Sequence, residues 1–362
     1  MKYIDEFRNK EKVKQLVSAI HQISKKDIRI MEVCGGHTMS IHKFGIPYML
    51  PTTIKLLSGP GCPVCVSSRQ YIDQAIACGR LDDVIITTFG DLIRVPGSSS
   101  SLEKEKAMGR NIIIVYSILD ALKIAEQNPD KKIVFLGIGF ETTAPGTAAG
   151  ILNAHRMGLK NFFVYSSHKI MPPAMTALIT EGIQIDGYIG PGHVSTITGK
   201  GIYEELTSNY SVGCVISGFE PIDLLQSIYM LVKQKEEGKP RLEIQYKRAV
   251  KTEGNIKALQ IMYEVFELRD DWWRGLGVLP LSGLGIKDKY AAFDAEKQIH
   301  VEVEPTRDDA GCICGEVLKG LKSPKECKLF DRTCNPANPV GACMVSSEGA
   351  CHAFYKYSKH SI

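Results

Sequence analysis

The chain has 362 residues, of which 44% are hydrophobic and 23% are charged, and its formal net charge is +4. This composition is ordinary for a globular protein with several buried layers, and it excludes a disordered chain. No dense Lys/Arg block with interleaved aromatic residues indicates a nucleic-acid groove, and no run of 18 or more apolar residues indicates a membrane span.

The first predicted element is a helix near the N-terminus. The first 20 residues are charged and amphipathic and lack the apolar core of a signal peptide, so we expect a cytoplasmic protein. From residue 11 to residue 23, apolar side chains recur at helical spacing. Residues 1–30 are therefore predicted to contain a helix that packs on the body of the protein.

Short apolar runs that end in glycine-containing loops follow this helix. They occupy residues 28–38, 53–65 and 83–97, and residues 111–128 read as a strand followed by a helix. Such runs, mostly rich in β-branched residues, are typical of strands buried on both faces of a parallel sheet. Residues 31–130 are therefore predicted to form a first α/β domain.

The next part of the chain repeats this design weakly. Residues 132–145, 186–195 and 213–225 mirror the earlier runs, and the Gly-Pro-Gly turn of 59–61 recurs in the second of them. We expect residues 131–225 to form a second, related α/β domain beside the first. In open α/β sheets ligands bind beyond the carboxyl ends of the strands, so the loops of both domains are predicted to face one cleft.

Polar and thiol side chains at the predicted strand ends are the candidates for that cleft. They are Cys34, His37, Thr38, Cys62, Cys65, Asp91, Glu141, Thr142, His193 and Glu220. The composition changes after them, and residues 226–362 are predicted to form an irregular, mainly helical third domain. Within it we expect helices over 224–240 and 255–277 and a loop-like segment over 279–299.

The chain has eleven cysteines, more than we expect if they had no function. Structural disulfides are reduced in the cytoplasm, so clustered cysteines there are expected to bind metal or to exchange electrons. In the C-terminal tail, four of them form a C-x12-C-x6-C-x16-C pattern: Cys314, Cys327, Cys334 and Cys351. Zinc sites usually use C-x2–4-C pairs, which this tail lacks, so the spacing favours an iron–sulfur cluster, with zinc as the alternative. Cys312 and Cys343 are then spare, and Cys78 and Cys214 are expected to be buried hydrophobic residues.

The stretch "GPGCPVC" at 59–65 holds a C-x-x-C pair. The following residues have helical periodicity, which places Cys62 near a helix N-terminus, where the dipole and free N–H groups lower a thiol pKa. Such a pair can close a reversible disulfide, whereas a structural zinc site would need a second C-x-x-C pair. Redox use is therefore favoured over a structural role. If the loop that carries Cys34 and His37 lies next to this pair, three thiols meet in one cleft.

Glu141 follows a buried run, where an acidic residue serves as a helix N-terminal charge or, facing thiols, moves protons. Neither "GIGFET" nor "TGKG" completes a nucleotide-binding motif, so we expect no nucleotide site there. Trp272 and Trp273 are expected to be packing residues.

Five motifs together resemble those of the HypD family of hydrogenase maturation factors. They are "CGGHT" (34–38), "GPGCPVC" (59–65), "GFETTAP" (139–145), "GPGHVS" (190–195) and the cysteine tail (314–351). They run along nearly the whole chain. One departure is Ser67-Ser68, where the family often has a proline.

The resemblance implies a role in building the Fe(CN)2(CO) group of [NiFe]-hydrogenases. A small partner, HypC, would share the iron with Cys34, and HypE, carrying a cyanide group made with HypF, would be the second partner. Cys62 and Cys65 match a redox dithiol, and Cys314, Cys327, Cys334 and Cys351 match the ligands of a [4Fe–4S] cluster. His37, Thr38 and Glu141 are assigned to hydrogen bonding or proton movement around the iron.

We therefore expect a scaffold with thiol-redox activity rather than a turnover enzyme. In this hypothesis the cluster feeds electrons to the Cys62/Cys65 dithiol beside the iron, and the hydrogenase large subunit is served indirectly. Two alternatives stay open: a zinc-binding structural protein, and an iron–sulfur electron carrier with no assembly role.

Overall fold

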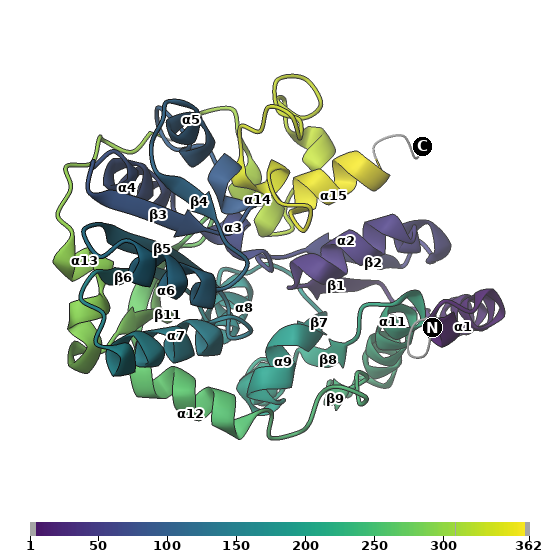
Figure 1. The fold of residues 1–362 in the computed structure, drawn as a ribbon. Helices are drawn as coiled ribbons and strands as arrows, with labels where there is room; N and C mark the ends of the chain where they lie inside the picture. The colour runs from purple at the N-terminus through teal and green to yellow at the C-terminus, as the bar shows by residue number, and fades with distance from the viewer. Residues whose placement is uncertain (1–4, 308, 359–362) are drawn as a thin grey trace.

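The β-branched apolar runs of the sequence form the strands of two parallel sheets. The computed structural model describes residues 5–307 and 309–358, and the two sheets lie side by side in it (Figure 1). Sheet A has the strand order β2-β1-β7-β8-β9, and sheet B has the order β4-β3-β5-β6. Within each sheet all strand pairs are parallel. The predicted α/β class with mostly parallel sheets is confirmed.

Sheet A carries the loops of greatest interest. Its strands are β1 (Ile28–Glu32), β2 (Ile54–Ser58), β7 (Gly187–Pro191), β8 (Gly213–Ser217) and β9 (Leu242–Ile244). Helix α11 (Pro221–Glu237) packs on β8, and α1 (Lys10–Ile23) packs on α11 with its apolar stripe. Helices α2 (Gly35–Lys43) and α9 (Gly192–Thr198) start at the carboxyl ends of β1 and β7.

Sheet B is covered by more helices. Its strands are β3 (Val84–Thr88), β4 (Ile112–Ile114), β5 (Lys132–Gly139) and β6 (Phe162–His168). Around it lie α4 (Arg69–Gly79), α5 (Leu102–Ala107), α6 (Ile118–Gln127), α7 (Ala144–Met157) and α8 (Met171–Thr180) (Figure 1). Every residue of β3 and β6 is buried, as expected for strands covered on both faces.

The sheets do not follow the domain boundary predicted at residue 130. Sheet A combines β1 and β2 with β7 and β8, whereas sheet B combines β3 and β4 with β5 and β6. The chain therefore leaves sheet A after β2, builds sheet B, and returns. The weak sequence repeat reflects strand–loop units that are similar in their local structure. It carries no information on which strands pair, because pairing depends on contacts far apart in the chain.

The part after residue 226 also differs from the prediction. Helix α11 belongs to sheet A, and α12 (Ile256–Val265) ends where β10 (Phe266–Trp273) begins. The segment expected to be loop-like contains β11 (Gly277–Ile286), which pairs with β10 as an antiparallel hairpin. This hairpin packs beside β6 and α8, so tertiary contacts decide its strand conformation. Trp273 is fully buried in it, consistent with a packing role.

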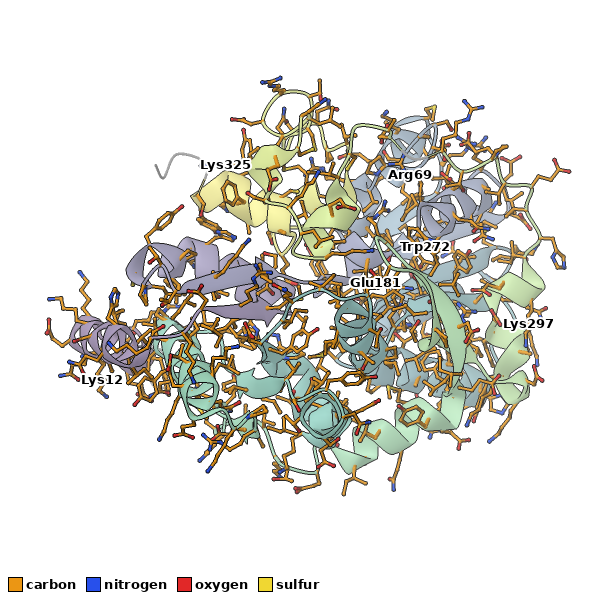
Figure 2. All side chains as sticks on the ribbon, turned by 180° about the vertical axis from the view of Figure 1, so that it is seen from behind. Lys12, Arg69, Glu181, Trp272, Lys297 and Lys325 are labelled. Atoms are coloured by element: carbon orange, nitrogen blue, oxygen red, sulfur yellow. A yellow bond between two sulfur atoms is a disulfide. The ribbon has the colours of Figure 1, made fainter. Side chains whose placement is uncertain are left out.

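The C-terminal tail lies across the two sheets with little regular structure. The described residues of the tail form only short helices: α14 (Cys314–Leu318), η6 (Pro324–Glu326), η7 (Ala342–Met344) and α15 (Ala350–Tyr357), the last of which packs on α2. Figure 2 shows Lys12 of α1 at one end of the molecule and Lys297 of α13 (Ala295–Gln298) at the other, with Lys325 of the tail above. Among the described residues, no helix has the length and apolar character needed to cross a membrane.

Candidate thiol and metal site

The Cys34 loop and the C-x-x-C loop lie against each other at the carboxyl edge of sheet A. The Gly35 N–H donates to the Gly61 carbonyl at 3.0 Å, and the Gly59 N–H donates to the Glu32 carbonyl at 2.8 Å. A Cβ on Gly61 would stand 2.1 Å from the Cys34 backbone nitrogen, so only glycine allows the two backbones to come this close. The two loops are therefore neighbours.

The C-x-x-C pair sits at the start of a short helix, as its sequence context predicts. Cys62 is the N-cap of α3 (Pro63–Val66), and its sulfur accepts a hydrogen bond from the Cys65 N–H at 3.3 Å. The two sulfurs form a disulfide, and both residues are buried. The pair can thus exist as a disulfide in this fold without any movement of the loop.

Cys34 is a partly exposed residue that immediately precedes α2. Burial of the sulfur and, next, the negative charge of Glu348 raise the pKa of its thiol to about 12, against the opposing effect of the Gly36 N–H. In the metal-free protein the Cys34 thiol is therefore protonated at neutral pH. A metal ion that binds its sulfur must displace that proton.

Two carboxylates beside Cys34 were not singled out from the sequence. Glu32 is buried, and it accepts hydrogen bonds from the Thr38 hydroxyl at 2.6 Å and from the Cys34 N–H at 3.2 Å; burial raises its pKa to about 8. Glu348 comes from the tail, and a Cβ on Gly35 would stand 2.5 Å from its Cβ. Glu32, a polar residue ending an apolar run, was detectable; Glu348, more than 300 residues away in the chain, had no such signal.

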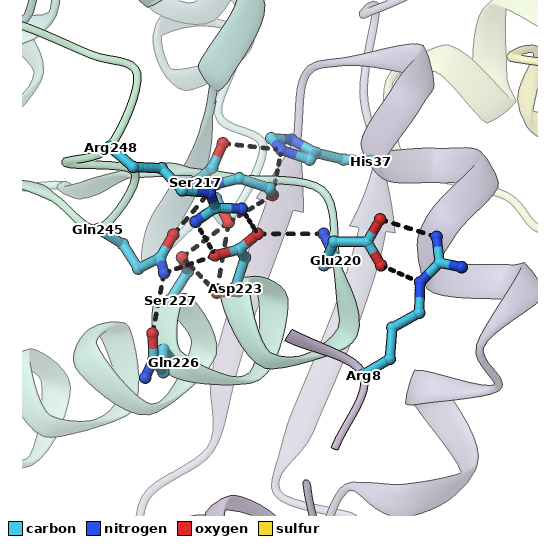
Figure 3. A network of polar contacts seen from close by, with 10 residues as sticks. Arg8, His37, Ser217, Glu220, Asp223, Gln226, Ser227, Gln245 and Arg248 are labelled. Carbon is cyan, nitrogen blue, oxygen red and sulfur yellow. Dashed lines mark hydrogen bonds and ion pairs between the residues drawn. The ribbon is translucent and has the colours of Figure 1, made fainter. Parts of the chain in front are cut away.

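His37 is fully buried, and its ring is fixed by backbone oxygens (Figure 3). Its Nε2 lies 3.2 Å from the Ser217 carbonyl oxygen and 3.1 Å from that of Gly218. Burial lowers the pKa of the imidazole to about 4, so the ring is neutral. Its Nδ1 is buried and has no hydrogen-bond partner among the described residues.

Glu141 lies at the end of β5 and is also buried. One of its oxygens accepts a hydrogen bond from the Met171 N–H at 3.0 Å, and the other has no partner among the described residues. Burial raises the pKa of this carboxyl to about 7. After burial, the charges of Glu141 and Cys34 are among the causes that raise the pKa of Tyr203, so this tyrosine lies within electrostatic range of both.

The other candidates at the strand ends have different surroundings. Asp91 accepts a hydrogen bond from the Ser346 hydroxyl of the tail at 2.7 Å, two residues before Glu348. Glu220 forms an ion pair with Arg8 of the N-terminal segment. Thr142 and His193 are exposed. The structure thus brings Cys34, Thr38 and the C-x-x-C pair together most closely.

The tail cysteines line one small cavity of about 20 Å³: Cys312, Cys314, Cys327, Cys334, Cys343 and Cys351. Cys314 and Cys343 form a disulfide, and the other four are free thiols. After burial, the charges of Cys312, Cys334 and Cys327 raise the pKa of Cys351, which places these four thiols close together. Their set differs from the one that the spacing predicts, because Cys314 is bonded and Cys312 is free.

No group of three or more His, Cys, Asp or Glu side chains in the described part of the chain is arranged to hold a single metal ion as it stands. The tail cavity lies close to the C-x-x-C loop, because α3 packs on η7, which carries Cys343. Cys78 and Cys214 are buried among apolar residues, as expected.

Residues 11–358 match the HypD family, described as "Hydrogenase formation hypA family". The chain belongs to the HypD family.

Its relatives are hydrogenase maturation factors. The chain is 47% identical to the hydrogenase maturation factor HypD of Azotobacter vinelandii over 99% of this chain and 97% of that protein. It is 43% identical to the hydrogenase maturation factor HypD of Escherichia coli (strain K12) over 99% and 98% of the two chains. Membership of the HypD family thus makes this chain a hydrogenase maturation factor.

Proposed function

We propose that this protein is the scaffold on which an iron ion receives CN and CO ligands before delivery to a [NiFe]-hydrogenase large subunit. HypC shares the iron at Cys34, and HypE, charged with cyanide through HypF, is the second partner. The observation that carries the proposal is the direct packing of the Cys34 loop on the C-x-x-C loop in a HypD-family chain.

The surroundings of Cys34 support iron as the cargo. Iron is attracted by the negative charge that Glu32 and Glu348 provide when ionised, and its charge favours the thiolate over the thiol. When the Cys34 sulfur binds iron, the S–H proton leaves to solvent or to a neighbouring carboxylate. The Cys34 residue is partly exposed although its sulfur is buried, and we propose that HypC reaches the iron from this exposed side.

The tail residues fit a [4Fe–4S] cluster in their donor chemistry, since four free thiols from one irregular segment surround one cavity. We assign the ligands as Cys312, Cys327, Cys334 and Cys351, replacing Cys314 of the spacing-based set, because Cys314 is bonded to Cys343. A cluster held there would supply electrons to the Cys314–Cys343 disulfide, which lines the same cavity.

The two disulfides form a chain of exchange partners between the cavity and Cys34. Reduction of the Cys314–Cys343 disulfide takes two electrons and two protons and gives two thiols. These thiols can reduce the Cys62–Cys65 disulfide by exchange, in which two S–H groups become one S–S bond while the other S–S bond becomes two S–H groups. The reducing equivalents then stand beside Cys34, where ligand addition to the iron requires them.

Infrared spectroscopy of the complex with HypC tests the proposal. Anaerobically purified complex is expected to show CO and CN stretching bands that disappear in Cys34→Ala and weaken at least tenfold in Cys62→Ser, while Cys78→Ala, which changes a buried thiol elsewhere, keeps them. Bands that persist in Cys34→Ala would disprove the iron site. Undiminished bands in Cys62→Ser would disprove the relay.

Metal analysis of the same samples separates the alternatives. The proposal expects iron and acid-labile sulfide in the tail. Zinc without sulfide would support the structural alternative, and a cluster without CO or CN bands would support an electron carrier that has no assembly role.

A further inference from the structure

Two backbone carbonyls meet the His37 imidazole, and a network of polar side chains lies behind them (Figure 3). The two carbonyls that meet Nε2 belong to Ser217 and Gly218, at the carboxyl end of β8. A carbonyl oxygen only accepts hydrogen bonds, so Nε2 must carry the hydrogen. In the neutral ring, Nδ1 is then unprotonated and can act only as an acceptor.

The position of Nδ1 is set by covalent geometry. It is bonded to Cγ, so it is the ring nitrogen nearer to the first turn of α2, the turn that Cys34 precedes. His37 stands at the third position of this helix, three residues after the N-cap residue Cys34. The buried acceptor without a partner is therefore the ring nitrogen nearer to the backbone of α2.

Further hydrogen bonds hold the two carbonyls in place. The Gly218 N–H donates to Gln245 Oε1 at 3.1 Å, and Gln245 Nε2 donates to Asp223 Oδ1 at 2.9 Å. Arg248 donates to both oxygens of Asp223, at 2.7 and 2.5 Å. The Ser217 hydroxyl donates to the Gly218 carbonyl at 3.0 Å.

Burying the histidine in this arrangement costs free energy of folding. Asp223 is fully buried, and a buried ion pair contributes less to stability than apolar packing of the same volume. An acceptor left without a partner also costs free energy. Both costs are explained if the network serves a particular orientation and tautomer of the ring.

We propose that Ser217, Asp223, Gln245 and Arg248 are positioning residues. They hold His37 as its Nε2–H tautomer, so that Nδ1 accepts a hydrogen bond from an N–H or O–H donor of the molecule that binds at Cys34. The orientation and tautomer follow from the contacts alone, while the role of the bound donor rests on the proposed function.

Nitrogen-15 NMR of the histidine rings tests the tautomer on the metal-free chain. His37, assigned by its absence in His37→Gln, is expected as a single Nε2–H tautomer in the wild type. In Asp223→Asn and in the milder variant Gln245→Met, the His37 ring is expected to become a mixture of the Nε2–H and Nδ1–H tautomers. Asp186→Asn, which removes the partner of Lys235 elsewhere on sheet A, is expected to leave the tautomer unchanged. An Nδ1–H tautomer in the wild type, or an unchanged ring in both network variants, would overturn the proposal.

A matched pair of substitutions tests the use of Nδ1 in the complex with HypC. In His37→Asn the amide oxygen can stand near the Nδ1 position, whereas in His37→Gln the amide N–H groups can stand near Nε2. Both variants lose the stacking of the ring on Phe219. We expect CO and CN bands within about threefold of wild type in His37→Asn and at least tenfold weaker in His37→Gln.

Equal loss in the two variants, or better retention in His37→Gln, would show that His37 acts only through its packing and its Nε2 bond. The absence of bands in the wild-type complex would instead count against the proposed function, and the NMR result would still decide the tautomer.

Discussion

The two cysteine regions of this molecule hold their thiols in different ways. Cys34, Cys62 and Cys65 lie on loops that leave parallel strands, and backbone hydrogen bonds and glycine contacts fix these loops. The six tail cysteines lie in a segment with short helices and many turns, where side chains of the cysteines themselves face a common cavity.

This difference predicts different sensitivities. The strand-end loops are held by close backbone contacts, so we expect a single added methyl group to destabilise the fold strongly. Loss of one of their sulfur atoms is expected to lower the stability of the fold less. The tail lacks a continuous ladder of backbone hydrogen bonds, so it depends on its covalent and metal links. The following predictions test that contrast.

The largest effect is expected from Gly61→Ala. The new Cβ would stand 2.1 Å from Cys34 N and 2.3 Å from Val33 C, and backbone atoms on both sides cannot move independently. We expect the free energy of unfolding to fall by about 4 kcal/mol, measured by chemical denaturation. Gly146→Ala, at an open helical position in α7, should be neutral or stabilising by up to about 1 kcal/mol. A loss below about 1 kcal/mol for Gly61→Ala would contradict the rigid-loop description.

Opening the disulfides should have the next largest effect. In the oxidised, metal-free chain, Cys343→Ser removes a link between residues 29 apart, and Cys62→Ser removes one between residues three apart. Because the stabilisation grows with loop length, we expect losses of about 3.5 and about 2 kcal/mol respectively. Denaturation with and without a reductant measures them, and both differences should vanish under reduction. A larger loss for Cys62→Ser would reverse the contrast between the two regions.

A third effect, expected to be smaller than that of Cys343→Ser, concerns whether water reaches the strand-end region. The pKa of Glu141 is raised to about 7 in the folded state, against an ordinary value of 4.5. The folded state therefore holds this proton more tightly, and its contribution to stability is lost as pH rises from about 4.5 to about 7. Relative to Glu141→Gln, the wild type should lose at most about 3 kcal/mol across this range.

Denaturation curves at several pH values check this expectation, with Glu103→Gln, at an exposed position, as the control. Curves for wild type and Glu141→Gln that run parallel between pH 4.5 and pH 7 would mean that water reaches the carboxyl group.

Much of the local structure was readable from the sequence. The β-branched runs with glycine loops predicted the strands and the parallel sheets, and "GPGCPVC" predicted a thiol at a helix start. The hairpin of β10 and β11 was not predicted, because its residues read as a helix and a loop until they pair beside β6. Glu348 was missed because nothing in its own segment indicates that it reaches Gly35.

The sequence by itself determined the class of fold, the family and the motifs that carry thiols, because these depend on local pattern and on residue identity. Only the tertiary structure decided which strands share a sheet and which tail cysteine is bonded to which. It alone shows that the His37 ring is held with Nδ1 free. These features arise from contacts between residues that can be more than 300 positions apart, and burial among them sets the protonation states that the chemistry requires.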